Sequence, residues 1–287
     1  MKTRHSLLLV LCLAAAAAQA QMNIKISTGR TFRQDTIDRK VLTVQYDMEA
    51  LTDLAHPGTP LKETMRLDIG QRSSRFYSYT AYLADSVLAA DAANGASMEL
   101  MARHAEQYRS QWSEQTFKRY PAGRVTTLDE LAGDISRLRC EEPEELPRWT
   151  LTADTLTLLG YRCTRATASF KGRQWSAWFA PDIAVSEGPW KLCGLPGLIL
   201  RAEDAEGHYR FTANGMEQSC GAEPIVFGGR DYEPVSRKQY NKMQERFAAD
   251  PVGFITGSMP NVKVSIRDEH GNATKNPKDT PYNPIER

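Results

Sequence analysis

Two carboxylates, Asp182 and Glu187, flank an apolar segment rich in proline and glycine, and they are the best candidates for acid–base chemistry in the sequence. A carboxyl group buried beside Trp190 would have a raised pKa and could act as a general acid. Such a pair would suit a carboxylate-dependent hydrolase centred on Asp182. A capped turn and a solvent-facing carboxylate are the simpler interpretation of the same two residues.

Other catalytic and metal-binding patterns are missing from the sequence. Outside the N-terminal segment the histidines are His56, His104, His208 and His270; no two have the spacing of metal ligands on one helix face, and there is no H-E-x-x-H. No G-x-S-x-G elbow, G-x-G-x-x-G loop or Walker loop occurs. We therefore expect no catalytic residue, no metal and no cofactor, and a non-enzymatic protein is favoured.

Large apolar side chains gather in the same segment and suggest a place for a ligand. Three of the five tryptophans lie between residues 160 and 201. They could line an apolar cleft, or they could plug the core. The candidate ligand-binding residues are Trp175, Trp178, Trp190, Leu195, Leu198 and Asp182. Nearby positive charge could orient an anionic ligand or protect a strand edge from aggregation; it comes from Arg162, Arg165, Lys171 and Arg173.

Hydrophobic periodicity predicts the elements that must position these residues. Period-two alternation indicates strands, and apolar positions three and four apart indicate helices. One helical region runs over 85–118, is interrupted at Asn94-Gly95 and restarts after Ser97; another runs over 237–249 after the N-cap Ser236. The main predicted strands are 40–51, 63–69, 75–80, 162–170, 175–180, 198–203 and 209–214, with shorter ones at 124–127, 135–140 and 262–266.

The N-terminal residues predict export. Residues 1–20 combine a basic start, an apolar core and an A-x-A site before Gln21, which is the pattern of a signal peptide. Cys12 raises a lipoprotein alternative, but Leu11 stands where that processing needs a small residue. Without Lys2 and Arg4, 34 basic residues face 35 acidic ones, so nucleic acid is not an expected partner. No later segment is long enough to span a membrane.

Four cysteines remain after the predicted cleavage, and an even number in an exported chain suggests disulfides. Asp204 to Gly207 is a good turn, and folding the chain about it brings Cys193 opposite Cys220. We therefore predict the pairs Cys193–Cys220 and, by elimination, Cys140–Cys163. Free buried thiols are the alternative.

The run Gly194 to Ile199 reads GLPGLI, and its surroundings are equally specific. They include 160–163 (GYRC), 170–173 (FKGR), 177–183 (AWFAPDI), 188–190 (GPW) and the terminal 283–286 (NPIE). The chain resembles the GLPGLI, or Porph_ging, family of exported proteins of Bacteroidetes. That resemblance implies no assigned activity and carries over no catalytic residue. Ala184 departs from the proline that the family more often has there.

The strand order around 160–180 is also similar to that of exported lipoprotein-carrier-like folds. We therefore expect an α+β protein with a strongly curved antiparallel β-sheet, half-barrel-like, and two or three helices packed against it. Residues 21–267 should form a single domain, and residues 268–287 an extended or mobile tail.

The leading functional prediction is an exported envelope protein, either periplasmic or extracellular, and a peripheral position at the outer membrane fits the same prediction. It would bind or carry an apolar small molecule or lipid, or dock onto an outer-membrane protein. The alternatives are the hydrolase centred on Asp182 and a structural subunit of an outer-membrane assembly.

Overall fold

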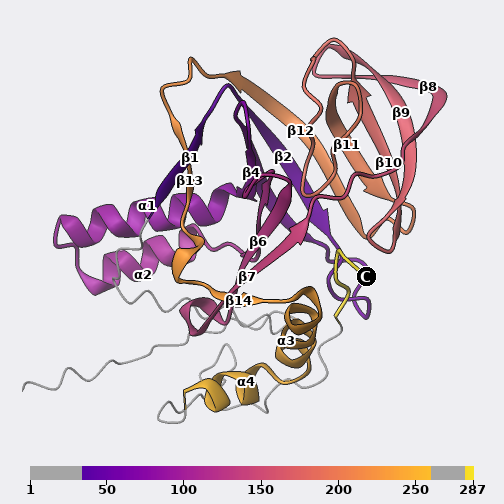
Figure 1. Cartoon of the computed structure of the whole chain (residues 1–287). Helices are drawn as coiled ribbons and strands as arrows, with labels where there is room; N and C mark the ends of the chain where they lie inside the picture. Colours follow the sequence, from indigo (N-terminus) through magenta and orange to yellow (C-terminus); the bar gives the residue numbers. More distant parts are fainter. Residues whose placement is uncertain (1–33, 260–281) are drawn as a thin grey trace, which may run out of the picture.

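The computed structural model describes residues 34–259 and 282–287 (Figure 1). The predicted signal peptide and the predicted strand 262–266 lie outside these ranges. The main sheet has 12 strands. In sheet order they are β14 (Glu233–Val235), β7 (Ser136–Pro143), β6 (Arg124–Leu131), β5 (Gln115–Lys118), β4 (Ser74–Ser78), β3 (Leu61–Ile69), β2 (Leu42–Ala50), β12 (Tyr209–Gln218), β11 (Leu198–Asp204), β10 (Arg173–Ala180), β9 (Tyr161–Phe170) and β8 (Thr150–Leu158).

The sheet is open, because its end strands β14 and β8 do not pair, and Figure 1 shows that it bends along the row of strands. Every junction is antiparallel except that of the short β14 with β7, which is parallel. A separate two-stranded sheet pairs β1 (Asp35–Arg39) with β13 (Pro224–Phe227). The α+β prediction is therefore confirmed, with one parallel strand added at the edge.

Four α-helices accompany the sheet in the described ranges: α1 (Tyr79–Ala93), α2 (Met98–Gln107), α3 (Arg237–Ala249) and α4 (Pro251–Ser258). Helix α1 contacts β3 and β4, α2 packs on α1, α3 packs on β7, and α4 packs on α3. Two short 3-10 turns cover Gly133–Ile135 and Gly229–Asp231.

The helix starts follow from their capping residues. Ser97 and Ser236 accept hydrogen bonds from the backbone at Leu100 and Gln239, as the sequence predicts. Ser78 caps α1 in the same way, so this helix begins before the predicted position 85. The prediction that the helical region extends to 118 is wrong, because α2 ends at Gln107 and residues 115–118 form β5 between β4 and β6.

The core lies between the middle strands and the loop that follows β10. In β2 the residues Leu42, Val44, Tyr46, Met48 and Ala50 are buried at every second position, which is the period of a strand with one face inside. Their side chains join those of β3, β10, β11 and β12 in the main hydrophobic cluster. The alternation of apolar and polar residues therefore decides which face of the central strands is buried in the core.

The hairpin between β9 and β10 turns on Lys171 and Gly172, whose φ angles are 50° and 79°. Two consecutive positive φ values define the turn whose twist matches that of paired strands. Gly172 also has a close neighbour, since a Cβ there would lie 2.6 Å from the Cβ of Arg287. The hairpin tip is therefore in contact with the end of the chain.

The predicted disulfides are wrong: Cys140, Cys163, Cys193 and Cys220 are free thiols. Ala202 does pair with Phe211 around the predicted turn, but β11 begins only at residue 198. The preceding loop carries Cys193 into the interior. On the other side of the turn, β12 pairs with β2 along its whole length, with a register shift between Ala213 and Gly215, and Cys220 lies exposed beyond its end. Cys140 and Cys163 lie on β7 and β9, near opposite ends of the strand order.

A thiol-labelling experiment checks this correction. In protein that begins at residue 21, a maleimide should modify Cys220 alone under native conditions, because the other three thiols are buried. All four should react in denaturant. A mass that is lower before reduction than after it, by the amount of a disulfide, would contradict the assignment of free thiols.

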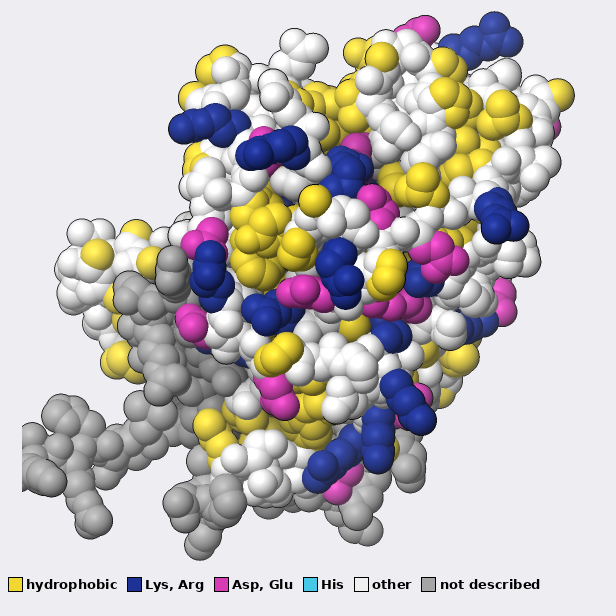
Figure 2. Space-filling model, viewed as in Figure 1, with side chains coloured by type: hydrophobic (Ala, Val, Ile, Leu, Met, Phe, Trp, Pro, Cys, Tyr) yellow, Lys and Arg dark blue, Asp and Glu magenta, His cyan; other side chains and the backbone are white. Residues whose placement is uncertain are grey.

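The surface carries both signs of charge. Figure 2 shows basic and acidic side chains interspersed across the face that it presents. No helix of the described ranges combines the length and apolar character needed to cross a bilayer.

Candidate functional site

The GLPGLI loop, residues 181–197, is held in the interior by a buried ion pair. Lys118 on β5 is fully buried, and its Nζ lies 2.7 Å from Oε2 of Glu187 and 2.6 Å from the carbonyl oxygen of Gly188. Arg119 contacts the other oxygen of Glu187. Burial alone would raise the pKa of Glu187, but the charges of Lys118 and Arg119 lower it below the usual value. Glu187 is therefore a fixed anion and not a general acid.

The glycines of the loop permit close approach of backbones. Gly197 has a φ of 152°, and a Cβ there would lie 2.3 Å from the carbonyl oxygen of Ala180. A Cβ on Gly188 would lie 2.8 Å from the carbonyl oxygen of Leu192. Any larger residue at either position would push two chain segments apart.

Most of the predicted ligand-binding residues lie in the core. Trp175, Trp190, Leu195 and Leu198 are all at most 2% exposed. The Trp175 ring lies 5.8 Å from that of Trp190 and 6.3 Å from that of Phe211, centroid to centroid. These side chains fill the interior together. Trp178 is half-buried and packs against the edge of this cluster, whereas Asp182 is exposed and lies outside it.

The end of the chain docks onto the same region. Asn283 and Ile285 are 3% and 5% exposed, so residues 282–287 pack against the rest of the protein; in Figure 1 this yellow segment lies beside the β9–β10 end of the sheet. Buried Arg173 donates to Oδ1 of Asn283 and to the carbonyl oxygen of Ile285, each at 2.9 Å, and also to the carbonyl oxygen of Pro284. One guanidinium therefore donates hydrogen bonds to three consecutive residues.

Other fixed groups complete this arrangement, which we call the C-terminal clamp. The Tyr209 hydroxyl donates to the carbonyl oxygen of Asn283 at 2.6 Å, and Nδ2 of Asn283 donates to the carbonyl oxygen of Leu51 at 2.7 Å. The backbone N–H of Arg287 donates to Lys171 O at 3.0 Å. The clamp comprises Leu51, Lys171, Arg173, Lys191, Asp204, Tyr209 and Arg237.

The Glu286 carboxylate lies among three cations of the clamp. Lys191 makes the closest contact, and Lys171 and Arg237 each lie 3.5 Å away. Lys191 is itself buried and also pairs with Glu142 at 3.0 Å. The positive charge of the clamp therefore favours an acidic residue at position 286 of the segment.

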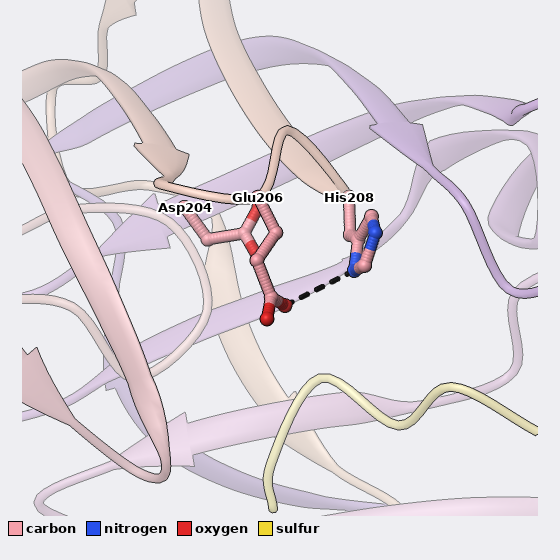
Figure 3. Close-up of side chains that lie close together, drawn as sticks. All are labelled: Asp204, Glu206 and His208. Carbon is pink, nitrogen blue, oxygen red and sulfur yellow. Dashed lines mark ion pairs between the residues drawn. The ribbon is translucent and has the colours of Figure 1, made fainter. Parts of the chain in front are cut away.

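Among the residues that the structure describes, one group has the composition of a metal site: Asp204, Glu206 and His208 at the β11–β12 turn (Figure 3). Its negative charge is already compensated by arginines. Arg173 lies 2.6 Å from Asp204, and Arg287 lies 2.7 Å from Glu206. The group serves to anchor the clamp and the end of the chain.

Sequence reasoning missed an acidic pair beneath the loop, formed by buried Asp129 and half-buried Glu114. Nε1 of Trp190 donates to Glu114 at 3.2 Å, and the Tyr240 hydroxyl lies 3.2 Å from Glu114 and 2.8 Å from Asp129. Burial raises the pKa of Glu114 to about 7, against the pull of Lys191. Neither carboxylate belongs to a motif, so no signal in the sequence singled them out.

These features define a class: an open-sheet α+β protein with a core-forming central loop and a clamp for its own C-terminal segment. Within that class, residues 169–201 match the family model described as "Protein of unknown function (Porph_ging)", which confirms the resemblance carried by the GLPGLI motif. No curated protein has a matching sequence.

Two solved structures of PNGF-II are similar to the chain. The P21 form has a TM-score of 0.48 and 12% identity over 76% of this chain and 34% of that chain. The C2 form has a TM-score of 0.46 and 12% identity over 71% of this chain and 32% of that chain. The chain therefore spans about a third of the length of PNGF-II.

Proposed function

We propose that this protein is a docking protein of the cell envelope that recognises an extended peptide segment of Asn-Pro-Ile-Glu type. Its own residues 283–287 occupy the recognition site in the absence of a partner. The observation that supports this most strongly is the set of three hydrogen bonds from Arg173 to Asn283, Pro284 and Ile285. Export belongs to the proposal and is supported by the signal-like residues 1–20.

The clamp has the chemistry of a specific peptide site. Contacts to main-chain carbonyl groups give affinity, while side-chain contacts give selectivity. The Asn283 amide is satisfied on both ends, by Arg173 and by the Leu51 carbonyl. A segment without this amide would leave two buried polar groups unpaired, which costs about 1–3 kcal/mol for each. Ile285 supplies an apolar anchor in the main hydrophobic cluster.

The other predicted functions have less support from the geometry. Carriage of an apolar molecule would need space among Trp175, Trp190 and the loop leucines, but these side chains pack against one another. A hydrolase centred on Asp182 would need a second carboxyl group nearby with a raised pKa, and Glu187 is a paired anion instead. Docking at an outer-membrane protein is compatible with the clamp, provided that this protein presents a segment of the same type.

Peptide exchange tests the proposal. A protease site introduced between residues 268 and 281 would allow the folded protein to be cut while the clamp stays occupied. A fluorescent Asn-Pro-Ile-Glu-Arg peptide should then displace the cut segment, as measured by anisotropy. A peptide with Ala in place of Asn should bind at least about tenfold more weakly, since about 1.4 kcal/mol corresponds to that factor.

The controls separate recognition from simple packing. A scrambled peptide of the same composition keeps the charge and should not compete. In the Arg173→Lys variant the charge remains but the fork of donors is lost, so affinity should fall although the protein folds. Equal binding of the scrambled peptide would refute the proposal.

A further inference from the structure

The hydrogen bonds around Tyr240 of α3 require a proton that the usual ionisation states do not supply. Its hydroxyl lies 3.2 Å from Oε2 of Glu114 and 2.8 Å from Oδ2 of Asp129. It also accepts a hydrogen bond from Gln244 at 2.9 Å. A phenol has one proton to donate and therefore cannot satisfy two ionised carboxylates.

Asp129 is the carboxylate that the surroundings favour as the anion. It accepts hydrogen bonds from the Ser113 hydroxyl at 2.6 Å, from the backbone N–H of Glu130 at 2.8 Å, and from Gln244. With these donors and the Tyr240 proton, its oxygen atoms are well supplied.

Glu114 has fewer donors. Its Oε1 atom accepts from Trp190 at 3.2 Å and lies 3.5 Å from the Thr116 hydroxyl. Its Oε2 atom has Tyr240 as its partner. If Oε2 carries the proton, Glu114 donates to Tyr240, Tyr240 donates to Asp129, and every group in this chain of hydrogen bonds is satisfied.

We propose that Glu114 carries a proton while the C-terminal segment occupies the clamp, and that ionisation of Glu114 loosens the segment. This inference rests on the clamp described in the proposed function and adds its regulation by pH. The two sites share cations, because the positive charges of Lys191 and Arg237 act on Glu114 and also contact Glu286.

The direction of the coupling follows from these charges. An ionised Glu114 would compete with Glu286 for Lys191 and Arg237, and in return the Glu286 charge raises the pKa of Glu114. Because such coupling is reciprocal, the segment should be held more tightly when Glu114 is protonated. Burial raises the pKa of Glu114 to about 7, so the segment should be held firmly below pH 7 and loosen above it.

The charged and titratable groups around Glu114 are Asp129 on β6, Glu142 on β7, Lys191 in the loop, Tyr209 on β12, Arg237 and Tyr240 on α3, and Tyr282 and Glu286 in the terminal segment.

Hydrogen exchange in the intact chain tests this coupling without a peptide in trans. After correction for the intrinsic pH dependence, the amides of residues 283 and 285–287 should open about threefold to tenfold more often at pH 8.5 than at pH 5.5, the effect of a pKa change of half to one unit. In Glu114→Gln, which is shaped like the protonated glutamate, opening should not change with pH. His208 lies 3.4 Å from Arg287, so His208→Gln is the control and should keep the wild-type response.

The proton itself can be observed separately. Infrared difference spectra of the intact protein should show the stretching band of a protonated carboxyl group near pH 6, absent in Glu114→Gln. A missing band, or opening that is equal at both pH values in the wild type, would overturn the inference. A failure of peptide exchange alone would instead refute docking in trans and leave this result standing.

Discussion

Replacement of Arg173 by Leu is expected to lower the free energy of unfolding by about 3–5 kcal/mol, the cost of breaking a buried ion pair on one side. The Arg173 side chain is 1% exposed, as is that of its partner Asp204, at 2.6 Å. Its removal leaves this carboxylate and three acceptors of the terminal segment without their donor. Urea denaturation followed by tryptophan fluorescence measures the change.

Arg210→Leu is the matched control on the same region of the sheet. Arg210 pairs with Glu49 at 3.2 Å and Glu203 at 3.1 Å, but its side chain is 42% exposed. Exposed pairs contribute about 0–1 kcal/mol, so this variant should be nearly as stable as the wild type. Equal losses in the two variants would contradict a special role for Arg173.

The sheet could be predicted largely from local patterns. Alternation in 40–51 and 63–69 corresponds to β2 and β3, and the turn at Asp204 to Gly207 joins β11 and β12 as predicted. Ser97 and Ser236 fixed two helix starts. The helical region predicted over 85–118 rested on apolar positions three and four apart, and pairing with β4 and β6 makes its end a strand instead.

The clamp could not be predicted, because its partners are remote in the chain. Arg173 and Asn283 are separated by 110 positions, and the terminal segment shows no periodicity. The cysteine pairing failed for a related reason. It was predicted by extending the strand register from the turn at Asp204 to Gly207, but the loop before β11 leaves the sheet and takes Cys193 out of that register. Glu114 gave no signal since its proton depends on Tyr240 and Asp129, which other elements supply.

The sequence left two interpretations open for the GLPGLI loop with Trp190: the lining of a ligand cleft, or a plug that fills the core. Trp190 has a φ of 50°, a conformation that bulky residues rarely adopt. Its ring packs at 6.1 Å from that of Phe170 and 5.8 Å from that of Trp175. Surrounding contacts therefore hold a strained backbone in place, as expected for a plug.

Trp190→Ala is accordingly expected to cost about 3–5 kcal/mol, the range for a large aromatic side chain removed from a core. It loses the ring contacts and also leaves Glu114 without the indole N–H. Trp178→Ala should cost much less, because this ring is only half-buried. A chemical denaturation series on both variants, followed by circular dichroism, measures the difference.

Trp190→Phe keeps a ring but not the donor, and should lose about 1 kcal/mol for the missing hydrogen bond in addition to the change in packing. If Trp190→Ala were as stable as Trp178→Ala, the loop would not be part of the core, and the interpretation as a ligand cleft would regain its support.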